Sequence, residues 1–178
     1  SAFVAGFFFS RDLLPTTGAT ACDGSNEGEL FYMLVPDPAG SVNGNEFRRG
    51  FVDSLTTGVI AHEFQHLISA SRRLFVNHAA APEAVWLNEG LSHVAEELLY
   101  YRESGMAPRQ NLGDADVRLG SAATYPYFKS DAASNMSRLV EYLADPGSNS
   151  PTATNDALAT RGATWSFLRY AVDQLYST

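Results

Sequence analysis

The sequence predicts an α+β protein in which a small mixed sheet in the N-terminal part precedes a mostly helical bundle. Two early segments are rich in aromatic and other β-forming residues and are bounded by Gly, Asp and Pro. Later segments are longer and carry apolar residues at helical spacing. With 178 residues, of which 45% are hydrophobic, the chain is long enough to bury a core. We therefore expect one domain over residues 1–178, with a sheet-containing lobe of about 1–75 and a helical lobe of about 76–178.

The expected elements follow one another in a simple order. The strands are residues 2–9 and 29–35, and the segments between and after them are loops rich in Gly, Asp, Asn and Pro. Residues 105–127 are expected to be loop-like, and residues 146–151 form a clear loop. The predicted helices span about 47–74, 83–103, 128–144 and 157–176.

Charge and composition exclude several classes of partner. The net charge is −8, from 12 Lys and Arg against 20 Asp and Glu, which disfavours nucleic acid and anionic membrane surfaces. No apolar run reaches the ~18 residues that a membrane span needs. Cys22 is the single cysteine, so an internal disulfide is excluded and a cysteine zinc cluster is not expected.

The first nine residues are too short and too uncharged for a signal peptide. Their composition is typical of the interior of a β-strand. We therefore interpret the chain as a mature form or an excised domain. A single cysteine is compatible with an extracellular protein, and we expect a secreted or cell-envelope location.

The most informative segment is His62-Glu63-Phe64-Gln65-His66. On a helix, residues four apart lie one above the other on the same face, so both imidazoles can reach one metal ion. The pattern H-E-x-x-H supplies two zinc ligands and, between them, a glutamate that acts as a general base. We therefore assign His62 and His66 as metal ligands and Glu63 as the base.

A histidine pair on a helix is often only a surface pair or a satisfied core pair. Here the preceding residues, Phe51 to Ala61, are spaced as a buried helix, and Ile60, Phe64 and Leu67 surround Glu63. Two imidazoles and a carboxylate are costly in a buried setting unless a metal or partner compensates them. The zinc interpretation is therefore favoured.

A third ligand is expected downstream, because catalytic zinc usually has three protein ligands and one open position, with two His and one Glu as a standard set. Glu89 lies 23 positions after His66, at the start of the second predicted helix. Glu83 competes, but it precedes the apolar run and suits a helix first turn. Glu96 and Glu97 are further candidates for this third position.

Glu96 lies seven positions after Glu89, two helical turns along the same face. We expect its carboxylate to accept a hydrogen bond from the ring nitrogen of His62 or His66 that faces away from the metal. Glu97 is expected to be solvated. His93 either lines the active-site cleft or is a helix-surface histidine.

These residues carry a family resemblance. The run from His62 to His66, followed by Trp86-Leu87-Asn88-Glu89-Gly90-Leu91-Ser92, resembles the gluzincin group of zinc metallopeptidases. The hyicolysin-type neutral zinc metallopeptidases are more similar, because they also share a C-terminal helix that resembles residues 162–170. The resemblance covers roughly residues 29–175. It implies zinc-dependent peptide-bond hydrolysis, with Glu89 as the third ligand and Glu63 as the base.

The chain departs from the aminopeptidase N-type gluzincins in two places. It has no Gly-x-Met-Glu-Asn segment, which in those enzymes holds the substrate's amino terminus, so an endopeptidase acting on peptides or proteins is favoured. It also has no tyrosine just ahead of Arg161-Gly162-Ala163, where those enzymes place a catalytic tyrosine. The residue that stabilises the oxyanion or donates a proton is therefore open among Tyr125, Tyr127, Arg161 and His93.

Two competing functions are compatible with the same residues. The first is a catalytically weak or inactive zinc-containing module that binds peptides or proteins, which the missing tyrosine leaves open. The second is a domain with structural zinc, or a metal-free helical domain of a larger assembly. The sequence does not indicate an oligomeric state.

Overall fold

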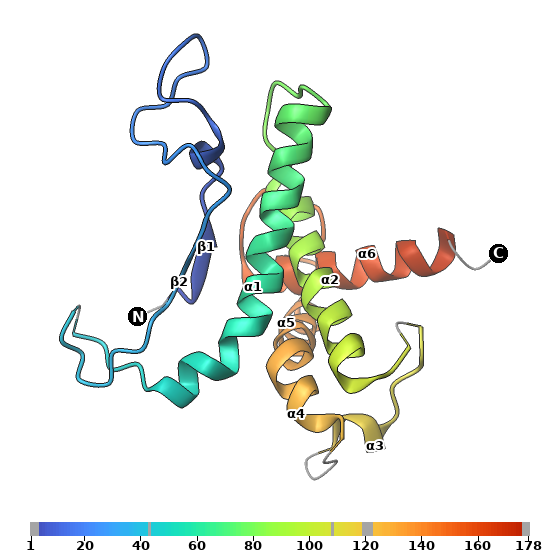
Figure 1. Ribbon diagram of the computed structural model, residues 1–178. Coiled ribbons are helices and arrows are strands. Elements are labelled where there is room, and N and C mark those ends of the chain that lie inside the picture. Colours follow the sequence, from blue (N-terminus) through green and yellow to red (C-terminus); the bar gives the residue numbers. More distant parts are fainter. Residues whose placement is uncertain (1–3, 43, 108, 119–122, 176–178) are drawn as a thin grey trace. The chain divides into compact units, whose positions relative to one another are not determined.

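The computed structural model describes residues 4–42, 44–107, 109–118 and 123–175. The chain divides into two compact units, residues 1–83 and 84–178. The first holds a small antiparallel sheet and one long helix, and the second is helical (Figure 1). The predicted α+β class is thus confirmed, while the single-domain organisation stays a prediction.

The sheet of the first unit has two strands, β1 (Gly6–Phe8) and β2 (Phe31–Met33), so it is antiparallel rather than mixed. Phe7 pairs with Tyr32 across the strands, and their rings stack with centroids 4.6 Å apart. The predicted segments 2–9 and 29–35 contain these strands, although residues 2 and 3 lie outside the described part. Each strand is shorter than expected.

Hydrogen bonds to a buried carboxylate hold the connection between the strands in place. The carboxylate belongs to Asp12, on a 3₁₀ turn (Ser10–Leu13). Its Oδ2 accepts a 2.6 Å hydrogen bond from the Tyr32 hydroxyl, and its Oδ1 accepts bonds from the Asn26 backbone and side chain at 3.1 and 3.2 Å. The bond from Tyr32, which is the largest effect, lowers the pKa of Asp12. A long loop without regular structure is thereby anchored to β2.

The long helix of the first unit is α1 (Arg49–Ser71), which passes into a π-helical turn (Arg72–Val76). These elements lie within the predicted helix 47–74 except for the final residues of the turn. The helix packs on the sheet at Gly6, where an added Cβ would lie only 2.5 Å from Cγ1 of Val59. A side chain at position 6 would push the sheet away from α1.

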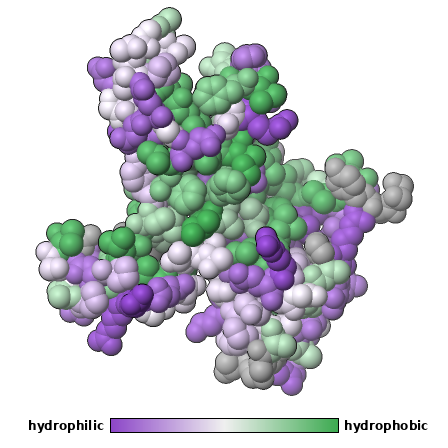
Figure 2. Space-filling model, viewed as in Figure 1, coloured by the Kyte–Doolittle hydropathy of each residue, from purple (hydrophilic) through white to green (hydrophobic). Residues whose placement is uncertain are grey.

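The expectation that α1 is mostly buried is wrong for part of its surface. Phe51 is 42% exposed, Ile60 40% and Phe64 51%. Val52 and Leu67 are buried, as are His62, Glu63 and His66. Hydrophobic residues are accordingly visible at the surface of the space-filling view (Figure 2). Apolar spacing alone predicted the helix correctly but overestimated its burial.

The second unit contains three long helices, α2 (Val85–Ser104), α5 (Ala133–Ala144) and α6 (Leu158–Leu175). All three agree with the predicted ranges, although residue 176 lies outside the described part. The stretch 105–127, expected to be loop-like, also contains two short helices, α3 (Asp114–Val117) and α4 (Tyr125–Tyr127). A π-helical turn (Phe128–Ala132) leads from α4 into α5.

Helix α6 packs against both α2 and α5, and two glycines permit the close approach. A Cβ at Gly90 on α2 would lie 2.2 Å from Cγ2 of Thr164 on α6. A Cβ at Gly162 on α6 would lie 2.2 Å from the backbone carbonyl carbon of Arg138 on α5. The residues that precede these glycines, Glu89 and Arg161, are consequently carried on tightly packed helices.

The hydrophobic core of this unit lies beside the C-terminal half of α2. Tyr100, Tyr101 and Ala132 are buried there, and Met106 and Phe128 pack against them.

In the described part of the chain, no helix combines the length and apolar character that a bilayer crossing requires.

Candidate metal centre

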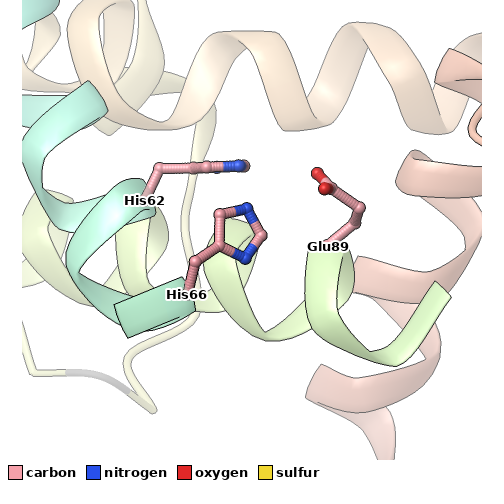
Figure 3. Close-up of side chains that lie close together, drawn as sticks. All are labelled: His62, His66 and Glu89. Atoms are coloured by element: carbon pink, nitrogen blue, oxygen red, sulfur yellow. The ribbon is translucent and has the colours of Figure 1, made fainter. Parts of the chain in front are cut away.

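Helix α1 presents His62 and His66 on one face, as the four-residue spacing predicts. Their rings meet edge to face with centroids 4.7 Å apart, and each offers a ring nitrogen within 4.8 Å of the other's. Both side chains project from the same side of α1 (Figure 3). His62 and His66 are each 8% exposed, and Glu63 is 6% exposed. The first unit thus supplies two neighbouring imidazoles with a carboxylate between them in sequence.

Glu89 lies near the N-terminal end of α2, where Figure 3 draws its carboxylate. Its Oε2 forms an ion pair of 2.8 Å with Nη1 of Arg161 on α6. The Arg161 guanidinium also donates two hydrogen bonds of 2.6 Å to Asp156, one to each carboxylate oxygen. Burial acts to lower the pKa of Arg161, but the bonds to Asp156 and the charge of Glu89 raise it overall.

The loop that carries Asp156 is itself fixed to the start of α6. The side-chain oxygen of Asn155 accepts hydrogen bonds from the Ala157 backbone at 3.1 Å and from the Thr160 hydroxyl at 2.8 Å. These bonds join Asn155 to the residue before α6 and to a side chain in the first turn of the helix. Asp156 therefore faces Arg161 from an ordered turn.

His93 is buried, with 1% of its surface exposed, so the helix-surface interpretation of this residue is wrong. Its Nδ1 lies 3.1 Å from Oε2 of Glu96 and 3.2 Å from Nη1 of Arg138. Asn135 donates a 3.1 Å hydrogen bond to the His93 backbone carbonyl and accepts one of 2.9 Å from Arg138. Burial, the largest effect, lowers the pKa of Arg138, while Glu96 opposes that change.

Glu96 lies one turn beyond His93, and its described partners on α2 and α5 are His93 and, at 3.9 Å, Arg138. The predicted hydrogen bond from His62 or His66 to Glu96 stays a prediction. A largely shielded carboxylate, 14% exposed, beside a buried histidine and an arginine is the kind of arrangement that fixes a histidine tautomer.

Glu97 contradicts the expectation that it is solvated. It is 7% exposed, and its Oε2 accepts a 2.7 Å hydrogen bond from Nε1 of Trp165 and lies 2.9 Å from Nε of Arg169. Burial raises the pKa of Glu97, while Arg169 and Trp165 counteract part of that rise. The residue thus binds α6 to α2 from inside the second unit.

The remaining residues singled out from the sequence occupy less central positions. Glu83 precedes α2 and pairs with Arg73 at 3.0 Å. Tyr125 is half-buried and Tyr127 is 37% exposed, and both belong to the short helix α4. Their predicted role in stabilising the oxyanion or donating a proton stays a prediction, as do those of Arg161 and His93.

Among the described residues, two sets of side chains have the donor types to hold a metal ion. One comprises His62, His66 and Glu89, and the other comprises His62, His93 and Glu96. The sequence indicated the residues of both sets. It gave no sign of Asp156, Arg138 or Asn135, because each lies far along the chain from the histidines and none belongs to a recognisable spacing pattern.

The chain is similar to the neutral metalloprotease ShpI of Staphylococcus hyicus, with 27% identity over 96 residues. The match covers 54% of this chain and 19% of the relative's length, so the chain matches about a fifth of that protein. No protein-family model matches the chain, and no solved structure matches it. A metalloprotease relative and a His/Glu group able to hold a metal together favour a metal-dependent function.

Proposed function

We propose that this chain is a zinc-dependent peptidase that cleaves internal peptide bonds. The observation that carries the proposal is the pair His62 and His66, buried on one face of α1 with Glu63 between them. We take Glu89 as the third ligand, which would give the two-His, one-Glu set that is typical of catalytic zinc. The similarity to a neutral metalloprotease supports the same conclusion.

The donor chemistry fits zinc better than calcium or magnesium. Imidazole nitrogens suit zinc and other transition metals, whereas calcium and magnesium prefer oxygen ligands. The two imidazoles each offer a ring nitrogen within 4.8 Å of the other's, so they are placed to share one ion. Three protein ligands leave a fourth position open for water and substrate, as catalysis requires.

Glu63 is the proposed general base. Zinc would polarise the scissile carbonyl and lower the pKa of the attacking water toward neutrality. Glu63 then takes the proton from that water and delivers it to the departing amine. Glu63 follows His62 directly in sequence and is only 6% exposed, so its carboxylate is shielded from bulk water.

The substrate is proposed to be an extended peptide. Strand β2 pairs with β1 on one side, and in a two-stranded sheet each strand keeps a second edge. An extended chain can add to such an edge through backbone hydrogen bonds that do not depend on its sequence. The absence of a Gly-x-Met-Glu-Asn segment favours an endopeptidase over an aminopeptidase.

A secreted or cell-envelope location is proposed, because the chain resembles neutral metalloproteases.

Two variants test the proposal. His66→Ala should lose most of the roughly one zinc per chain that elemental analysis is expected to find in the parent. Glu63→Gln should keep the zinc and the fold but hydrolyse casein at least about 100-fold more slowly, because an amide cannot accept the proton. A parent that binds zinc but does not cleave peptides would instead support a zinc-containing module that only binds them.

A further inference from the structure

We propose that Asp156 and Arg161 are positioning residues that hold Glu89 in the orientation in which it binds the metal. The inference rests on the proposed function, because it takes Glu89 as a zinc ligand. Its evidence is separate, since Glu89, Asp156 and Arg161 all belong to the second unit. No sequence motif indicated Asp156, its contact with Arg161 or the contact of Arg161 with Glu89.

The three side chains form a directed series of charge-assisted contacts. Asp156 binds the Arg161 guanidinium through both carboxylate oxygens at 2.6 Å, which is the two-point geometry that fixes an arginine most firmly. Nη1 of Arg161 in turn lies 2.8 Å from Oε2 of Glu89. A carboxylate held at one oxygen has a restricted rotation, and its other oxygen can face a metal.

The arrangement is partly shielded from solvent. The Arg161 side chain is 22% exposed and that of Glu89 15%, whereas Asp156 is 51% exposed. Charged pairs in such surroundings are screened less than surface pairs, so the contact to Glu89 is stronger than an ordinary surface ion pair. Asp156 also balances the positive charge of Arg161, which would otherwise draw electron density from Glu89 and weaken it as a ligand.

The backbone around these residues suits a positioning role. Gly90, next to Glu89, lets α2 approach α6, and Gly162, next to Arg161, lets α6 approach α5. Asn155, next to Asp156, ties the preceding loop to the first turn of α6. Glu89 and Arg161 therefore lie beside close helix contacts, and Asp156 lies beside a residue bonded to the start of α6; residues that orient metal ligands need such support.

The test measures zinc affinity by competition with a chromophoric chelator, using the 178-residue chain. Asp156→Asn should weaken zinc binding about 10- to 100-fold, as does the loss of other groups that orient metal ligands. Arg161→Gln should weaken it at least as much, and Arg161→Lys should recover part of the loss. The double variant Asp156→Asn, Arg161→Gln should be no worse than Arg161→Gln alone, because Asp156 acts through Arg161.

A matched control is Asp114→Asn, which breaks the exposed pair of Asp114 and Arg118 in the same unit and should leave zinc affinity unchanged. Replacement of zinc by cobalt adds a readout that a general loss of stability would not move, since Asp156→Asn should alter the visible absorption bands that report ligand geometry. Circular dichroism of the metal-free proteins should show similar folding, and Arg161→Lys keeps the test valid where a more drastic variant does not fold.

The outcomes separate the two proposals. If Asp156→Asn and Arg161→Gln bind zinc as tightly as the parent while His66→Ala loses it, the positioning role is wrong and the zinc site stands. If Arg161→Lys slows hydrolysis with zinc affinity and cobalt spectrum unchanged, Arg161 acts on the substrate and the inference is overturned. If the parent binds no zinc, the proposed function fails and this inference falls with it.

Discussion

Asp131 is a buried carboxyl group whose ionisation should destabilise the chain at neutral pH. It is 3% exposed, and neither carboxylate oxygen has a hydrogen bond of ordinary geometry among the described residues. Burial raises the pKa of Asp131 from 3.8 to about 6; Ser130 opposes the rise, and the negative charge of Glu103 adds to it. Asp131 therefore holds its proton more tightly in the folded chain than in the unfolded chain.

The sign of the pH dependence follows from this difference. The stabilisation from the protonated form is fully present below the unfolded pKa of 3.8 and is lost as the pH rises through about 6. A shift of about two units, at 1.36 kcal/mol each, corresponds to about 3 kcal/mol of unfolding free energy. Asp131→Asn cannot ionise, so it should be more stable than the parent by up to this amount above pH ~7, and the difference should vanish near pH ~4.

Urea unfolding followed by tryptophan fluorescence suits the test, because Trp86 and Trp165 both lie in the second unit together with Asp131. The free energy of unfolding of parent and Asp131→Asn would be compared from pH 4 to 8. Asp114→Asn, at a side chain 70% exposed, serves as the control and should change stability by no more than about 0.5 kcal/mol. Equal stabilities of parent and Asp131→Asn at pH 8, or a gap that grows toward acid, would refute the reasoning.

Three further predictions concern packing and the metal. Gly162→Ala places a Cβ against the Arg138 backbone and should cost about 1–3 kcal/mol in urea unfolding; an unchanged midpoint would contradict the close approach of α5 and α6. Trp165→Phe removes the donor to buried Glu97 and should cost about 1–3 kcal/mol by circular dichroism, whereas a neutral result would mean that the 2.7 Å bond contributes nothing. Dialysis against a zinc chelator should abolish casein hydrolysis and added zinc should restore it; activity that survives complete zinc removal would speak against metal-dependent cleavage.

The helices could be predicted from the sequence because their apolar residues recur at helical spacing over long segments. Helix α1 (Arg49–Ser71) lies inside the predicted range 47–74, and α2 (Val85–Ser104) differs from 83–103 by one or two residues at each end. The short helices between residues 105 and 127 were missed, since a helix of three or four residues leaves too little periodicity to detect.

Burial of charged residues was much harder to predict than the helices. Glu96 and Glu97 are adjacent in sequence, and only the tertiary structure places Glu97 beside Trp165, which is 68 residues away. His93 could not be distinguished from a surface histidine, because its partners Asn135 and Arg138 come from α5. His62, Glu63 and His66 were accessible from the sequence because H-E-x-x-H couples residue type to helical spacing within five positions. Glu89 was accessible because it opens the second predicted helix, in a segment that resembles zinc metallopeptidases.

The most direct test of the central claim is a crystal structure of the purified chain with an anomalous difference map at the zinc absorption edge. We predict one zinc peak, with ring nitrogens of His62 and His66 and a carboxylate oxygen of Glu89 at about 2.0–2.2 Å and a fourth position open to solvent. A map without a zinc peak, a fourth protein ligand that closes the site, or a zinc bound by His93 and Glu96 instead of His66 and Glu89 would contradict it.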